Sequence, residues 1–284
     1  MAAGHLEAGS FPGSLDLSLT LESGQTFLWR DVGDRWYRTV DDGQVIEVRE
    51  RDGGLDWRAH GDPVPSIRKR LGLDTDLPAI LEAFPDDPVL QAARDRLAGL
   101  RLVNEPPVPT VFSFILSAQM RVERIHELVT ALRRTYGDRI EWGEESVAQF
   151  PETRVLAETS EEALRDLGLG YRAPYVRETA KLLAAGAIDL DAVADLPYER
   201  AREALTELVG VGPKVADCVL LFGMGFSEPV PLDTWIRTAI QEHFPGAAKG
   251  SYAETSRAIR ERLGPHPGYA QTYVFTHLRT REGA

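Results

Sequence analysis

One lysine in the C-terminal half of the chain has the setting of a nucleophile. Lys214 follows Pro213 directly after the glycine-rich segment 210–212, which places it in the first turn of a predicted apolar helix. Burial and the positive end of the helix dipole both favour the neutral form of an amine at this position. A neutral amine can attack an electrophilic carbon, whereas an ordinary ammonium group cannot.

The surroundings of Lys214 separate it from the other lysines. The other three lie in polar segments: Lys69, Lys181 and Lys249. Helical spacing places Lys214 on one face with Cys218, Leu221 and Phe222, which favours an apolar environment. The alternative is a lysine whose stem extends to the surface so that its amine binds a phosphate. Lys214 alone does not decide between these two interpretations.

Asp233 is the second candidate for chemistry. The segment SEPVPLDTWIRTAIQ is interrupted by two prolines and ends in an aspartate placed to cap the helix that follows. Capping alone would explain an aspartate before Thr234. A carboxylate beside the Lys214 amine would also stabilise the positive charge that develops on a sugar when a base departs, and it would assist proton transfer.

The segment LTELVGVGPKVADC predicts two helices joined by a tight turn. The first helix is expected to end at Val209, and Gly210 and Gly212 are expected to make a turn that needs residues without Cβ. Pro213 then opens the second helix. Backbone N–H groups at such a helix start can bind a phosphate without adding formal charge. A plain helix–turn–helix connection containing glycine is the alternative.

Composition limits the classes of function. The 284 residues carry a net charge of −12, but a whole-chain sum says little about one face, so DNA remains a possible partner. The single Cys218 excludes an intramolecular disulfide and a cysteine-cluster metal site, and the six histidines are scattered, so we expect no metal and no cofactor. We expect no membrane contact and an intracellular protein, since no long apolar run or secretory signal is readable. Acidic residues outnumber basic ones and only four lysines are present, a composition that favours a protein from the salt-rich cytoplasm of a prokaryote.

The pattern of apolar residues predicts an α+β fold. Alternation and turn signals predict strands from about residue 15 to residue 60, LDLSLTLES included, in an antiparallel meander. From about residue 64 the period becomes helical. We therefore expect a small N-terminal antiparallel β domain packed on a larger all-helical domain that contains the helix-hairpin-helix. The expected bounds are residues 1–105, with trailing helices, and residues 106–284.

Taken together, these segments resemble the helix-hairpin-helix DNA glycosylases that carry a Gly/Pro-rich loop and a catalytic aspartate, the HhH-GPD superfamily. Within them the chain is most similar to the eukaryotic-type 8-oxoguanine DNA glycosylase/AP lyases. GVGPKVADC followed by PLD, at the family's lysine-to-aspartate interval, is the most specific segment. LESGQTFLWR, SFILSAQMRVERI, LGLGYRAPYV and GYAQTYVFTHLR extend the resemblance over nearly the whole chain.

The resemblance implies a bifunctional base-excision repair enzyme. Such an enzyme flips 8-oxoguanine, an oxidised purine, out of double-stranded DNA and excises it through a Schiff base on Lys214. It then cleaves the strand by β-elimination. Asp233 would be the essential carboxylate. The backbone carbonyl of Gly24 would accept the N7–H that 8-oxoguanine has and guanine lacks. Cys218 and Phe275 would sandwich the base.

The remaining site residues also follow from the resemblance. Gln271 would read the Watson–Crick edge of the base, and Phe222 would line the pocket where the family has a methionine. Tyr171 would wedge into the base stack, while Arg172 and Arg124 would hold the orphaned cytosine. The implied DNA-binding set is Gln119, Arg124, Tyr171, Arg172, Gly210 and Gly212.

Two further sites, one of three residues and one of a single residue, depart from the family pattern. Gln119, Met120 and Arg121 stand where the family shows consecutive asparagines, which puts discrimination for cytosine opposite the lesion in question. Trp235 stands where the family has a histidine that contacts a phosphate.

Two rival functions stay open. One is a monofunctional alkylpurine DNA glycosylase of the same superfamily, which lacks the lysine. The other is a non-catalytic helix-hairpin-helix module that only binds DNA, and it gives no reason for Lys214, Asp233, Gly24 and Phe275 to occur together. We expect the protein to be a monomer.

Overall fold

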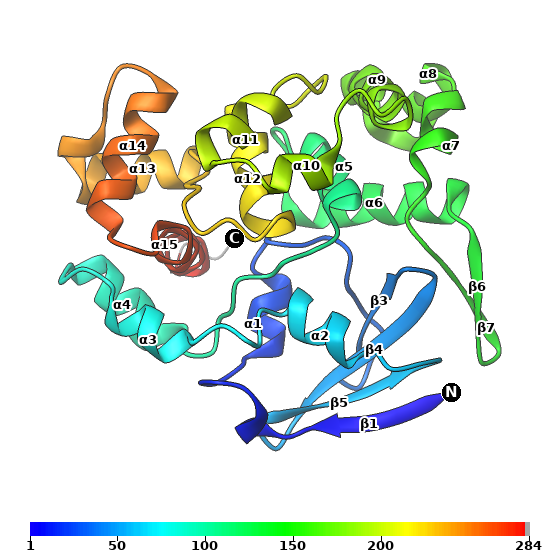
Figure 1. The fold of residues 1–284 in the computed structure, drawn as a ribbon, viewed down its shortest axis with the longest axis horizontal. Coiled ribbons are helices and arrows are strands. Elements are labelled where there is room, and N and C mark those ends of the chain that lie inside the picture. Colours follow the sequence, from blue (N-terminus) through cyan, green and yellow to red (C-terminus); the bar gives the residue numbers. More distant parts are fainter. Residues whose placement is uncertain (282–284) are drawn as a thin grey trace.

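The computed structural model describes residues 1–281 and has the predicted α+β class (Figure 1). An antiparallel sheet of five strands forms the N-terminal part, in the order β1-β5-β4-β3-β2. Its strands are β1 (Ala2–Leu6), β2 (Arg30–Asp31), β3 (Tyr37–Asp41), β4 (Gln44–Arg51) and β5 (Gly54–Ala59). The helical part lies on one side of this sheet, with α1 and α2 between them (Figure 1).

Two tight hairpins set the register of the central strands. The β3–β4 turn contains Asp42 and Gly43, with φ of 44° and 71°, and the β4–β5 turn contains Asp52 and Gly53, with φ of 51° and 74°. Two consecutive residues with positive φ match the right-handed twist of the flanking strands, which explains the Asp-Gly pairs. The sequence prediction of these strands is confirmed.

The prediction of a strand at residues 15–23 is wrong, because this segment forms helix α1 (Leu17–Glu22). The side chain of Asp16 caps the helix by accepting a hydrogen bond from the Leu19 amide at 2.8 Å. Leu17 and Leu21 are both buried. A run with leucine at every second position also has leucines at i and i+4. It therefore fits the two-residue period of a strand and the 3.6-residue period of a helix equally well. Strands β1 and β2, which were not predicted, complete the sheet by pairing with β5 and β3.

Fourteen further α-helices follow α1 within residues 1–281. They are α2 (Val64–Arg70), α3 (Leu77–Glu82), α4 (Pro88–Arg96), α5 (Pro107–Leu116), α6 (Val122–Tyr136), α7 (Thr153–Glu158), α8 (Glu161–Leu164), α9 (Ala173–Ala184), α10 (Leu190–Ala194), α11 (Tyr198–Leu205), α12 (Pro213–Gly223), α13 (Thr234–His243), α14 (Tyr252–Leu263) and α15 (Pro267–Arg281). Among the described residues, no helix is long and apolar enough to cross a bilayer.

A hairpin that the sequence analysis did not predict joins the helical part to the sheet. Strands β6 (Arg139–Trp142) and β7 (Glu145–Ala148) extend from the end of α6 toward β4 (Figure 1). The Trp142 indole donates to Glu47 Oε1 at 3.2 Å, and Arg38 forms an ion pair with Glu145 at 2.6 Å. The hairpin therefore braces the sheet against the long helix α6.

Glu105 fixes the sheet domain to the central helices. Its buried carboxylate forms an ion pair with Arg70 at 2.5 Å and accepts hydrogen bonds from Thr26 Oγ1 at 2.7 Å and Trp29 Nε1 at 2.8 Å. Its backbone amide donates to the carbonyl of Phe222, near the end of α12, at 2.7 Å. A charge buried in this way is retained only where it is fully paired. This residue thus links the sheet domain to the helix that carries Lys214.

Candidate active site

A helical hairpin presents the start of α12. Helix α11 ends at Leu205, four residues before the predicted end at Val209, because the last turn tightens: Leu208 N donates to Leu205 O at 3.1 Å. Gly210 has a φ of 85°, and a Cβ there would lie 2.7 Å from Tyr175 Cβ, so glycine is required for two reasons.

Gly212 does not need glycine for the turn itself, which corrects the prediction. Its φ of −86° suits any residue, and a Cβ there would meet no atom within 4 Å. The space in front of the first turn of α12 is therefore open. An open approach to the N-terminus of an eleven-residue helix leaves its free N–H groups available to an anion.

Lys214 lies in that first turn, as predicted, and it is half-buried rather than enclosed. Its Nζ is 3.4 Å from Ser117 Oγ and 5.6 Å from the ring centroid of Phe114, both from the α5 side of the core. Of the other lysines, Lys181 is paired with Glu178 at 2.6 Å. The amine of Lys214 therefore lies against an aromatic ring and a hydroxyl, with one side open.

Asp233 caps α13 and lies within the electrostatic reach of Lys214. Its Oδ1 accepts a hydrogen bond from the Ile236 amide at 2.8 Å. Burial raises the pKa of Asp233, while the Ile236 amide and the charge of Lys214 oppose that rise. The capping interpretation is confirmed, and the cap fixes the carboxylate of Asp233 in one orientation.

The face of α12 below Lys214 is apolar, as its spacing predicted. Cys218 is 3% exposed and Phe222 is 7% exposed. Burial raises the pKa of the Cys218 thiol to about 11, with the charge of Lys214 opposing the rise. The Phe222 ring stacks on Phe114 with centroids 5.6 Å apart. A protonated, buried thiol is a packing group and not a nucleophile at neutral pH.

A second group of predicted residues meets at the junction of the two domains. Gly24, with a φ of 92°, lies beside α15: a Cβ there would be 3.9 Å from Phe275 Cε1, 3.5 Å from Val122 Cγ2 and 3.1 Å from Arg279 Nη1. Gln271, one turn before Phe275, is buried, and its amide donates to Thr272 Oγ1 at 2.7 Å. The structure thus brings Gly24 and Phe275 together across the whole length of the chain.

The turn between α5 and α6 connects the two groups. Ser117, at its start, contacts Lys214, and Val122, at its end, lies beside Gly24. Gln119 between them is exposed and has a φ of 53°, which is unusual for a residue other than glycine, asparagine or aspartate. A strained, exposed residue between two candidate binding groups is typical of a functional loop.

Three predicted DNA-binding residues gather around this turn. Tyr171 is 49% exposed, and its hydroxyl donates to the Ala118 carbonyl at 3.4 Å. Arg172 is buried, donates to the same carbonyl, and lies 4.3 Å from the Tyr171 ring centroid. Arg124 is half-exposed and paired with Glu127 at 2.7 Å. The two arginines are close to the turn but are engaged by other residues of the protein.

A buried polar network behind the site was missed by the sequence analysis. Asp217 is fully buried and accepts hydrogen bonds from the Tyr198 hydroxyl at 2.8 Å and the Tyr252 hydroxyl at 2.6 Å. The Tyr252 hydroxyl in turn accepts from the Leu232 amide at 3.2 Å. The network therefore joins the helix of Lys214 to the loop that ends in Asp233.

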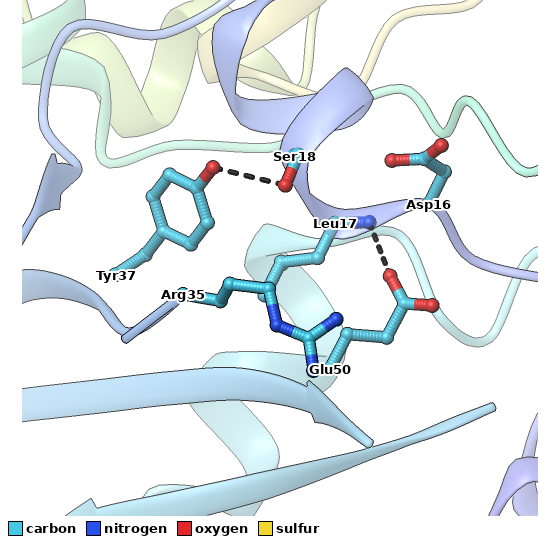
Figure 2. Close-up of a pocket in the computed structure, with 6 residues that line it drawn as sticks. All are labelled: Asp16, Leu17, Ser18, Arg35, Tyr37 and Glu50. Atoms are coloured by element: carbon cyan, nitrogen blue, oxygen red, sulfur yellow. Dashed lines mark hydrogen bonds between the residues drawn. The ribbon is translucent and has the colours of Figure 1, made fainter. Parts of the chain in front are cut away.

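A separate hollow of about 300 Å³ on the sheet domain contains none of the predicted site residues. Figure 2 shows its polar groups turned toward one another: Glu50 accepts from the Leu17 amide at 2.9 Å, and the Tyr37 hydroxyl donates to Ser18 Oγ at 3.0 Å. Within residues 1–281, no group of three or more histidine, cysteine or acidic side chains is placed to hold a metal ion.

Comparisons with known proteins agree with this arrangement. Residues 112–265 match the HhH-GPD superfamily of base excision DNA repair proteins, and residues 11–111 match the N-terminal domain of 8-oxoguanine DNA glycosylase. The chain therefore belongs to the HhH-GPD superfamily. Its N-terminal domain is of the 8-oxoguanine DNA glycosylase type, so the resemblance found in the sequence is confirmed.

Individual relatives match along most of their length. A probable N-glycosylase/DNA lyase of Methanothermobacter thermautotrophicus is 34% identical over 94% of this chain and 94% of its own. The N-glycosylase/DNA lyase OGG1 of Arabidopsis thaliana is 29% identical over 92% of this chain and 76% of its own. The 8-oxoguanine glycosylase/lyase of Clostridium acetobutylicum, solved with double-stranded DNA containing cytosine opposite 8-oxoguanine, superposes with a TM-score of 0.88 at 26% identity, covering 95% of this chain and 93% of that one.

Proposed function

We propose that this protein is a bifunctional DNA glycosylase and AP lyase that removes 8-oxoguanine from duplex DNA. The observation that carries the proposal is the placement of Lys214 at the open start of α12, with the capped carboxylate of Asp233 within its electrostatic reach. The relatives named N-glycosylase/DNA lyase, which match along nearly the whole chain, support the same activity.

The two residues divide the chemistry between them. Lys214 Nζ attacks C1′ of the flipped nucleotide, and the C1′–N9 bond breaks as the base leaves with its electron pair and takes up a proton. One of the two amine protons passes to the departing base and the other to O4′ as the C1′–O4′ bond breaks and the sugar ring opens, which gives an imine between Nζ and C1′. Loss of a C2′ proton then expels the 3′ phosphate and nicks the strand. Asp233 stabilises the positive charge that develops on the sugar. The amine itself is the nucleophile, so the proposal includes no cofactor.

The DNA partner approaches over the hairpin and the neighbouring turn. The free amides at Gly210 and Gly212 bind backbone phosphate without a formal charge, which reconciles DNA binding with a net charge of −12. Exposed Tyr171 fills the gap left by the flipped base. Arg124 and Arg172 leave Glu127 and the Ala118 carbonyl and bind the orphaned base instead. Cys218 and Phe275 stack on the flipped base, and Gln271 reads its edge.

We also propose the setting in which the enzyme acts. A relative at 34% identity comes from a prokaryote, and the acid excess with four lysines suits a salt-rich cytoplasm. We place the domain boundary between residues 105 and 106, at the buried Glu105, and we expect a monomer.

A base-release assay tests the function. Duplexes carry 8-oxoguanine, 7-methylguanine or undamaged guanine at one position, and both the free base and the nicked strand are measured. We expect release of 8-oxoguanine accompanied by nicking. Release of the alkylated base alone would support the monofunctional rival, and tight binding with no release would support a non-catalytic module.

A further inference from the structure

Arg279 is not among the residues singled out by the sequence, yet it lies beside Gly24 and Phe275. Its Nη1 is 3.1 Å from the position of a Cβ on Gly24, and its guanidinium carbon is 5.6 Å from the Phe275 ring centroid. Gln271, Phe275 and Arg279 are spaced at i, i+4 and i+8 on α15, so they share one face of that helix. Arg279 therefore continues the face that carries the two predicted base-contacting residues.

The guanidinium is anchored at one nitrogen and has donors left over. Nη2 donates to the backbone carbonyl of Glu22 at 2.8 Å, while Nε is buried without a hydrogen-bond partner among the described residues. Burial lowers the pKa of Arg279, and the charge of Glu123 opposes that decrease. An arginine remains charged in proteins, and among residues 1–281 the guanidinium donates only through Nη2, so Nη1 is left to donate to an acceptor that enters beside Gly24.

The lesion offers such an acceptor next to the atom that Gly24 would recognise. 8-Oxoguanine differs from guanine at two adjacent positions: N7 carries a hydrogen and C8 carries a carbonyl oxygen. The carbonyl of Gly24 can pair only with the first of these. A buried O8 without a donor would be unfavourable, so a pocket that takes the base out of water needs a donor next to Gly24. Arg279 Nη1 is a donor in that place.

We propose that Arg279 is a specificity-determining residue that donates a hydrogen bond to O8 of the flipped base. This inference rests on the proposed function, because it takes 8-oxoguanine as the substrate. The hydrogen bond between Nη2 and the Glu22 carbonyl holds the side chain while Nη1 faces the Gly24 side. Gly24 and Arg279 together then present an acceptor and a donor that match the N7–H and O8 of the lesion and mismatch the N7 and C8–H of guanine.

The test separates contact with O8 from a general effect on the pocket. Arg279→Met keeps an unbranched stem beside Phe275 but removes every donor, and Arg281→Met, an exposed arginine on the same helix, is the matched control. Single-turnover release is measured for 8-oxoguanine and for 8-thioguanine, which keeps N7–H but replaces O8 with sulfur, a weak acceptor. Nicking at a preformed abasic site and thermal unfolding are measured for each variant.

We expect Arg279→Met to slow release of 8-oxoguanine by about 10- to 100-fold, the range for losing a hydrogen bond from a charged donor. Release of 8-thioguanine and nicking of the abasic site should change by less than about threefold, a difference of about 0.7 kcal/mol, and Arg281→Met should behave as the wild type. Unchanged release of 8-oxoguanine would overturn the proposal. An equal decrease on both bases, or on the abasic site, would also overturn it, since a phosphate contact or a distorted pocket predicts that result. A wild-type protein that released no 8-oxoguanine would instead refute the proposed function, and this inference with it.

Discussion

Gly24 and Phe275 lie against each other although they belong to opposite ends of the chain. A Cβ on Gly24 would be 3.9 Å from Phe275 Cε1, and the φ of Gly24 is 92°, a conformation that other residues rarely adopt. The backbone conformation therefore requires glycine, whereas Phe275 itself would leave room for a Cβ. The sheet domain thus contributes a backbone segment to a candidate site otherwise built from helices.

Replacement of this glycine should separate the two activities. Gly24→Ala places a methyl group about where the base must approach and strains the backbone by about 1 kcal/mol or more. We expect release of 8-oxoguanine to fall much more than nicking of a preformed abasic site, which needs only Lys214 and the sugar. Kinetics on the two DNA substrates measure this. An equal decrease in both rates would show that Gly24 supports the fold rather than the base pocket.

Asp233→Asn should lower turnover by orders of magnitude with little loss of stability. The carboxylate charge that stabilises the cationic sugar is removed, while asparagine caps helices about as well as aspartate. The hydrogen bond from Ile236 N to Oδ1 can therefore persist. Excision rates and thermal unfolding of the same preparation measure the two effects. A variant that was chiefly unfolded would show that capping was the main role of Asp233.

The sequence predicted those parts of the site that local spacing encodes. Lys214 after Pro213, and Asp233 before a helix, are positioned by short-range rules of helix starts, and the structure places both as expected. The Asp-Gly hairpins of the sheet are likewise local. The apolar face of α12 follows from its helical period alone.

Features that depend on partners far along the chain were not predictable in this way. Residues 17–22 satisfy both the strand and the helix period, and packing against the sheet decides between them. The role of Arg279 depends on the distant Gly24, although its spacing from Phe275 was a usable signal. The buried Asp217 looked like one more polar residue on an apolar helix, because its tyrosine partners come from α11 and α14.

Asp217 should make stability depend on pH in the acidic range. Burial raises its pKa to about 6, and the hydrogen bonds from Tyr252 and Tyr198 oppose that rise. Because the folded pKa exceeds the unfolded value, the folded state holds the proton more tightly. The contribution of the Asp217 carboxyl to the free energy of unfolding is fully present below about pH 4, and it is lost as the pH rises through about 6. A rise of about two units corresponds to about 3 kcal/mol.

Asp217→Asn cannot ionise and isolates this contribution. We expect the free energy of unfolding of the wild type, relative to the variant, to decrease by up to about 3 kcal/mol between about pH 4 and pH 6.5. Denaturant unfolding of both proteins at a series of pH values measures the difference between their free energies of unfolding. The contributions of the other titrating groups cancel in this difference. A difference that stayed constant over this range would contradict the prediction.

The preference for the base opposite the lesion should be relaxed. Gln119, Met120 and Arg121 lack the paired amides expected to bind cytosine, and Arg124 and Arg172 are engaged by Glu127 and Ala118. We expect comparable excision rates opposite cytosine and at least one other base, measured on four duplexes that differ only at that position. A rate opposite cytosine more than about a hundredfold above every other, or roughly 2.7 kcal/mol, would show that the two arginines suffice.

Borohydride trapping on a duplex containing 8-oxoguanine tests the central claim most directly, because only an enzyme that forms an imine becomes covalently linked to DNA. We predict efficient trapping of the wild type with the cross-link on Lys214. The variant Lys214→Gln, which keeps a polar side chain beside Ser117, should bind the duplex but give no cross-link, no released base and no nick. Substantial trapping of Lys214→Gln, or a cross-link on any other residue of the wild type, would contradict the account.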